Sequence, residues 1–135
     1  MKIIYPTIDE LIKQNYLALE IIKLKKADKH QVLSNIKLYE IIKECERTNG
    51  DVYDKAKILL KGIIQKHPFA SGNRRTAFIV TRNFIIFNNY KFSVESSADN
   101  STIMLGIREN YYTDEEIKEW MKNGKIKDFK RNEKT

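Results

Sequence analysis

The chain has 135 residues, enough for one domain with a buried core, and 25 Lys and Arg residues against 18 Asp and Glu. The net charge of +7 favours anionic partners such as a nucleotide, nucleic acid or an acidic protein, although solvated lysines on helix faces account for much of it. The single cysteine, Cys45, excludes an internal disulfide framework. No apolar run is long enough to span a bilayer, so we expect a soluble, cytoplasmic protein without a membrane partner.

Apolar residues recur at helical spacing along most of the chain. Thr7 and Glu10 form the pattern of a capping box, which predicts that the first helix begins there. The charged residues 24–31 predict a loop, and we interpret His30 within it as a surface histidine. A second helix is predicted over residues 32–46, with Cys45 as a small packing residue.

Turn-forming residues separate the helices of the middle of the chain. Asn49 and Gly50 predict a turn, and Asp51 is a suitable cap for a helix over residues 52–66. Gly62 inside this helix is costly unless another helix passes close to it. Asn73 begins the next helix, which is apolar on most sides and breaks at residues 88–89.

The last third of the sequence predicts two further helices. A short extended piece is expected at residues 92–94, and Ser97 or Asp99 then caps the first of these helices. Thr113 opens a second capping box, and its helix ends near Gly124. The fold class is therefore all-α, with one domain over residues 1–124 and a basic tail, residues 125–135, that we expect to be frayed.

The chemistry concentrates between the two central helices, in His67-Pro68-Phe69-Ala70-Ser71-Gly72-Asn73-Arg74-Arg75. A helix N-terminus presents backbone N–H groups to an anion, and Gly72 allows the chain to approach a phosphate closely. Arg75 can bind phosphate oxygens with both arms of its guanidinium group. Because imidazole titrates near cellular pH, His67 suits a general base. Pro68 and Phe69 are expected to anchor the loop.

This stretch resembles the signature of the Fic/Doc family, His-Pro-Phe-x-(Asp/Glu)-Gly-Asn-(Gly/Lys)-Arg. The matching positions are His67, Pro68, Phe69, Gly72, Asn73 and Arg75. The resemblance implies a Fic-like helical bundle with the active-site loop between two central helices. Arg74, a long cation where adenylyltransferases of the family have Gly, resembles the Doc (death-on-curing) type, in which Lys occupies this position. Phe78 stands where the longer signature has a second Arg, which agrees with the Doc type.

The resemblance implies a transferase that moves a phosphoryl group from ATP or another nucleoside triphosphate onto a protein hydroxyl. His67 and Arg75 are then the catalytic residues, and Gly72, Asn73, Arg74 and Arg75 bind the nucleotide phosphates. In Doc-type relatives the target is elongation factor Tu. A flap that pairs with the target backbone is expected near residues 27–31. Two alternatives stay open: a protein adenylyltransferase (AMPylation), and a non-catalytic module that binds a phosphate compound or a partner.

Ser71 departs from the family pattern, which has a carboxylate here that holds Mg²⁺ against the phosphates. A serine hydroxyl is a neutral and weaker ligand for a hard cation. Three outcomes remain open: Mg²⁺ binds weakly through Ser71 and the nucleotide, another acid supplies the ligand, or the protein binds a phosphate compound without turnover.

Fic proteins are typically inhibited by a helix with the pattern Ser/Thr-x-x-x-Glu-Gly/Asn. The pair Glu109-Asn110 has Leu105 in place of the Ser or Thr, so the pattern is incomplete here. The resemblance then implies a toxin whose antitoxin is a separate chain, as in Doc-type toxin–antitoxin pairs. The sequence contains no nucleic-acid-binding motif, and we rank a nucleic-acid partner last.

Overall fold

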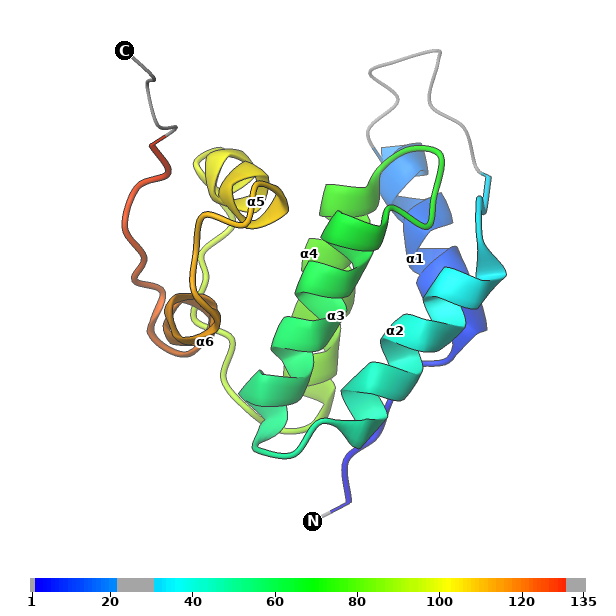
Figure 1. Cartoon of the computed structure of the whole chain (residues 1–135), viewed down its shortest axis with the longest axis horizontal. Coiled ribbons are helices and arrows are strands. Elements are labelled where there is room, and N and C mark those ends of the chain that lie inside the picture. Colours follow the sequence, from blue (N-terminus) through cyan, green and yellow to red (C-terminus); the bar gives the residue numbers. More distant parts are fainter. Residues whose placement is uncertain (1, 22–30, 131–135) are drawn as a thin grey trace.

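The computed structural model of the chain describes residues 2–21 and 31–130, and this part folds into helices without a β-strand (Figure 1). The elements are α1 (Ile8–Ile21), α2 (Asn35–Arg47), α3 (Val52–Lys66), α4 (Asn73–Phe87), α5 (Asn100–Arg108) and α6 (Asp114–Asn123). The predicted all-α fold class is therefore confirmed.

Helices α3 and α4 form a central pair, with α1 and α2 on one side and α5 and α6 on the other (Figure 1). Helix α2 packs against α3, α1 packs against α4 and α2, and both α5 and α6 pack against α3. The six-residue connection 67–72 joins α3 to α4 at one end of the pair. The structure thus confirms the expected loop between two central helices.

Local capping signals set most helix ends. Asp51 accepts hydrogen bonds from the backbone N–H groups of Tyr53 and Asp54, and the Asp54 carboxylate accepts one from Asp51 in return. The equivalent box opens α6 at Thr113, and Gly124 ends that helix with a φ of 74°. Because a cap depends on residues within one turn, these ends were predictable from the sequence.

The predicted start of the second helix at residue 32 is wrong. Helix α2 begins at Asn35, because Ser34 caps it by accepting a hydrogen bond from Lys37 N at 3.1 Å. Val32 instead forms an isolated antiparallel bridge with Phe69. Except for Gln31, the predicted loop over residues 24–31 lies outside the described residues, and so do His30 and residues 27–30 of the expected flap.

Close packing between α2 and α3 explains Gly62. A Cβ atom there would lie 2.9 Å from Cγ1 of Ile41, so only glycine lets the two helices approach this closely. Cys45 is fully buried in the same region, and burial raises the pKa of its thiol to about 12. The predicted packing role of Cys45 is confirmed.

The C-terminal part folds over α5 and α6. Residues 92–94 form no strand, and Ser93 N instead donates to Met121 O at 2.9 Å. Of the tail that we expected to be frayed, residues 125–130 make contacts: Phe129 packs edge-on against Tyr111 at 5.1 Å, and Tyr112 donates to Lys127 O at 2.9 Å. The remaining residues, 131–135, lie outside the described part. None of the described helices combines the length and the apolar character that crossing a membrane requires.

Candidate active site

The backbone of loop 67–72 is held by neighbouring segments on both sides. From the segment before α2, Leu33 N donates to Pro68 O at 2.8 Å, and Gln31 O accepts from Ala70 N at 2.9 Å. From α1, the buried Asn15 donates to Ser71 O at 2.8 Å. Because its backbone groups are paired in this way, the loop has a defined shape in the absence of any ligand.

Asn73 holds the loop from inside. Its side chain is 5% exposed and brackets Phe69: Oδ1 accepts from Phe69 N at 3.0 Å, and Nδ2 donates to Phe69 O at 2.8 Å. Phe69 itself is fully buried in the core, as its predicted role as an anchor requires. The amide of Asn73 therefore positions the loop, in addition to any contact that its backbone makes with a ligand.

His67 ends α3 in a strained backbone conformation. It is the C-cap of α3 and has φ of 53° and ψ of 58°, in the left-handed region that glycine normally occupies at helix ends. A non-glycine residue there costs about 1–2 kcal/mol. Since the imidazole is exposed, core packing does not explain the choice of histidine. Strain at this exposed residue makes its side chain a candidate for a functional role.

The second hydrogen of the Asn73 amide fixes the tautomer of this histidine. Asn73 Nδ2 lies 3.1 Å from His67 Nδ1, and an amide nitrogen only donates, so Nδ1 accepts. The neutral ring then carries its hydrogen on Nε2. Proton uptake from a substrate therefore requires that Nδ1 leave Asn73, either to take the proton itself or to free the Nε2 lone pair by a change of tautomer.

A cavity of about 270 Å³ lies beside the loop. Its lining residues come from α3, the loop, the first turn of α4 and the end of α5: Ile64, His67, Ser71, Gly72, Asn73, Arg74, Arg75 and Arg108. We call it the arginine cavity. It brings together the predicted site residues except the anchors Pro68 and Phe69, which are buried behind it.

Two features make the arginine cavity suitable for an anion. Gly72, the N-cap of α4, has a φ of 76° and offers no side-chain cap, whereas the caps of α3 and α6 satisfy their own first turns. The N-cap residue thus offers no side-chain acceptor to the first N–H groups of α4. In addition, Nη1 of Arg75 is buried and makes no hydrogen bond within the described part of the chain. An ordered water, an ion or a ligand can complete a donor of this kind.

A second cavity, of about 520 Å³, shares Arg74 and Arg75 with the first. Phe78, Ile79 and Met104 give it an apolar wall. Its polar lining residues are short: Ser96, Ser97, Asn100 and Ser101. We call it the serine-rimmed cavity. A ligand that reaches both cavities would have an anionic part beside His67 and a flatter, apolar part beside Phe78.

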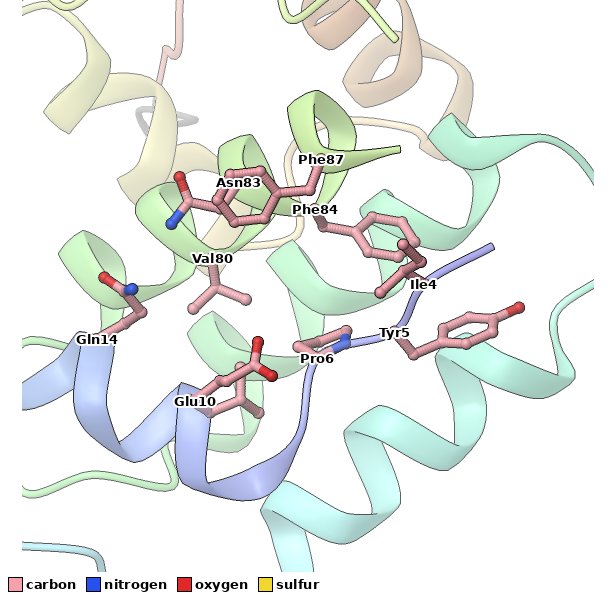
Figure 2. A pocket seen from close by; sticks show the side chains of 10 residues that line it. Ile4, Tyr5, Pro6, Glu10, Gln14, Val80, Asn83, Phe84 and Phe87 are labelled. Carbon is pink, nitrogen blue, oxygen red and sulfur yellow. The ribbon is translucent and has the colours of Figure 1, made fainter. Parts of the chain in front are cut away.

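A third cavity, smaller at about 60 Å³, lies between the N-terminal segment, α1 and the second half of α4 (Figure 2). The figure shows Pro6, Glu10 and Gln14 facing Val80 and Phe84 across it. Among the described residues that line it none is a cation, and Glu10 is an acid. It therefore does not suit an anion, unlike the arginine cavity.

The side chains of the arginine cavity do not fit a divalent cation. Mg²⁺ is bound by oxygen ligands, usually with at least one carboxylate. Among the described residues lining the cavity, Ser71 offers a neutral hydroxyl, and the side-chain oxygen of Asn73 accepts from Phe69 N. No group of three or more His, Cys, Asp or Glu side chains suited to a metal occurs in the described residues.

Two residues of the site were missed by sequence reasoning. Asn15 appeared only as one position of an amphipathic helix, yet it ties α1 to the loop and, through Thr76 Oγ1 at 3.1 Å, to α4. Arg108 lies 33 positions after Arg75 at the end of a different helix. Its only local signal was a basic residue in a last helical turn, which is common in any helix.

Comparison with protein families finds one match: the model described as the Fic/DOC family covers residues 16–85. This range includes loop 67–72 and the first turn of α4, and it excludes α5 with Arg108. Comparison with curated proteins and with solved structures gives no match.

Proposed function

The chain belongs to the Fic/DOC family, and we propose that it is a Fic-type transferase that moves a phosphoryl group from a nucleoside triphosphate onto a protein hydroxyl. The observation that carries the proposal is the arginine cavity, in which His67, the N-terminus of α4 and Arg75 meet. The adjoining serine-rimmed cavity supports a nucleotide rather than a bare phosphate as the donor, because it offers an apolar wall.

In the proposed reaction the γ-phosphate lies at the N-terminus of α4. Arg75 and the backbone N–H groups hold its oxygens, so that they bear the charge that develops during transfer. The hydroxyl oxygen of the target forms the new bond to phosphorus, the bond to the bridging oxygen breaks, and the nucleoside diphosphate leaves. The hydroxyl proton goes to His67, whose imidazole is exposed and can turn away from Asn73 at the loss of one hydrogen bond.

Labelled ATP tests this proposal. Purified protein is incubated with cell extract and with ATP labelled at the α- or the γ-phosphate, and His67→Ala is run in parallel. We expect label from the γ position on a protein, and its loss in the variant. Label from the α position would replace the proposed reaction by adenylyl transfer. Arg75→Gln should also lose the label, because it removes the cation that holds the phosphate oxygens. Arg82→Gln is its matched control, because Arg82 is an exposed arginine of the same helix that lines neither the arginine nor the serine-rimmed cavity.

A second candidate is a binding module without turnover. Two observations favour it: the arginine cavity does not fit Mg²⁺, and Asn73 holds His67 in the tautomer that is not basic at Nε2. This candidate predicts that ATP binds while neither label is transferred, in an extract in which elongation factor Tu is confirmed. Ser71→Asp then separates the two cases, because transfer that appears only in this variant identifies Ser71 as the residue that silences the site.

We further propose that this transferase is a toxin neutralised by a separate antitoxin chain, with elongation factor Tu as its target. Glu109, the acid of the incomplete inhibitory pattern, ends α5 and does not line either of the two cavities among the described residues. Expression of the chain with and without any small protein encoded beside its gene tests this, and equal growth in both cases contradicts it.

A further inference from the structure

The charges of the arginine cavity do not balance. Arg74, Arg75 and Arg108 bring three guanidinium groups to one cavity of about 270 Å³, and no Asp or Glu is among the described residues that line it. Like charges gathered in this way repel one another and favour a strongly anionic ligand. Within the described residues, Nη1 of Arg75 makes no hydrogen bond to the protein, so no protein acceptor lies against that end of the guanidinium group.

Arg108 owes its place to the packing of α5. The neighbouring Ile107 is 1% exposed, and its carbonyl accepts a hydrogen bond from Gln65 Nε2 of α3 at 3.1 Å. Gly106 lies against Tyr112, where an added Cβ would approach Cε2 to 2.5 Å. The last turn of α5 is therefore fixed relative to α3. Arg108, at the end of this turn, lines the arginine cavity although it lies outside the family-matched segment, residues 16–85.

We propose that the arginine cavity binds the phosphates of a free nucleoside triphosphate without a divalent cation, and that Arg108 supplies part of the positive charge that a metal would otherwise bring. This inference rests on the proposed function for the nature of the ligand. A metal-free triphosphate carries more negative charge than its magnesium complex, so three cations without a carboxylate favour the free form. Guanidinium groups bind phosphate oxygens with two parallel hydrogen bonds and need no metal to bridge them.

Titration calorimetry with ATP tests the proposal on the full chain, once in excess EDTA and once in excess Mg²⁺. We expect the wild-type protein to bind ATP in EDTA at least as tightly as in Mg²⁺. Arg108→Gln should weaken binding in EDTA about tenfold or more, the equivalent of one lost charge-assisted hydrogen bond. Arg82→Gln removes the same charge outside both cavities and should change binding less than about twofold. Because both arginines are exposed, neither change threatens the fold.

Ser71→Asp is the complementary variant. A carboxylate in the cavity repels the free triphosphate and offers Mg²⁺ a ligand, so binding in EDTA should weaken and binding in Mg²⁺ should recover.

Three results would overturn the inference. ATP binding by the wild-type protein only when Mg²⁺ is present contradicts metal independence, and it leaves the proposed transferase standing if the label is still transferred. Equal effects of Arg108→Gln and Arg82→Gln contradict the role of Arg108. Absence of ATP binding in both buffers overturns this inference together with the proposed donor.

Discussion

Replacement of Asn73 by alanine tests whether the candidate site is preorganised by its own loop. The change removes both hydrogen bonds to Phe69, from Oδ1 at 3.0 Å and from Nδ2 at 2.8 Å, as well as the contact to His67. Because Phe69 is fully buried, its N–H and C=O groups lose partners that water does not readily replace. We expect the loop to loosen and the whole protein to become less stable.

The expected loss can be estimated from these contacts. A buried backbone group left unpaired costs about 1–3 kcal/mol, so two such groups predict a fall of about 2–6 kcal/mol in the free energy of unfolding. An unfolding entropy of about 2.1 cal/mol/K per residue over 135 residues gives about 0.28 kcal/mol/K. The melting temperature should therefore fall by about 7–21 °C.

Thermal and urea unfolding followed by circular dichroism measure this loss. Asn83→Ala is the matched control, because Asn83 is an amide of the same helix that faces the third cavity (Figure 2). We expect this control to stay within about 0.5 kcal/mol of the wild-type protein. If Asn73→Ala is no more destabilising than Asn83→Ala, the amide does not brace the loop, and our account of how the site is held is wrong.

Three further predictions concern strain, burial and charge. In urea unfolding, His67→Gly should be more stable than His67→Ala by about 1 kcal/mol, because only glycine relieves the strain of the left-handed φ of 53°. Both variants should lack transferase activity. Equal stabilities of the two variants would contradict the strain. Cys45, whose thiol pKa burial raises to about 12, should not react with a thiol reagent at pH 8 until the protein is unfolded, and rapid reaction of the native protein would contradict its burial. The hydrogen bond from Lys118 lowers the pKa of Asp54 in the folded protein. At pH values above the unfolded pKa of about 3.9 this carboxylate therefore stabilises the fold, and its contribution disappears as the pH falls through the lower pKa of the folded state. Stability measured from pH 5 to pH 3 should therefore decrease less steeply in Asp54→Asn, and an unchanged slope would count against the ion pair.

Much of the helical framework could be predicted because its signals are local. Asp51 before α3, Thr113 before α6 and Gly124 after it act within one helical turn, and the structure places those ends where the caps indicated. The start of α2 was misplaced for the opposite reason. Val32 has an apolar side chain at helical spacing, but its backbone bridges to Phe69, and the sequence near residue 32 carries no sign of that partner.

The sequence by itself determined the chemistry of the loop: a histidine, a glycine that tolerates a left-handed φ, and Arg75 at the start of a helix. These residues lie within nine positions, so their proximity follows from chain connectivity alone. Only the tertiary structure decided how they are held and which group joins them. Asn15 and Arg108 come from other helices, and their distance from the loop depends on how α1 packs on α4 and α5 on α3. Helix packing is the sum of many weak apolar contacts between distant residues, which no short stretch of sequence encodes.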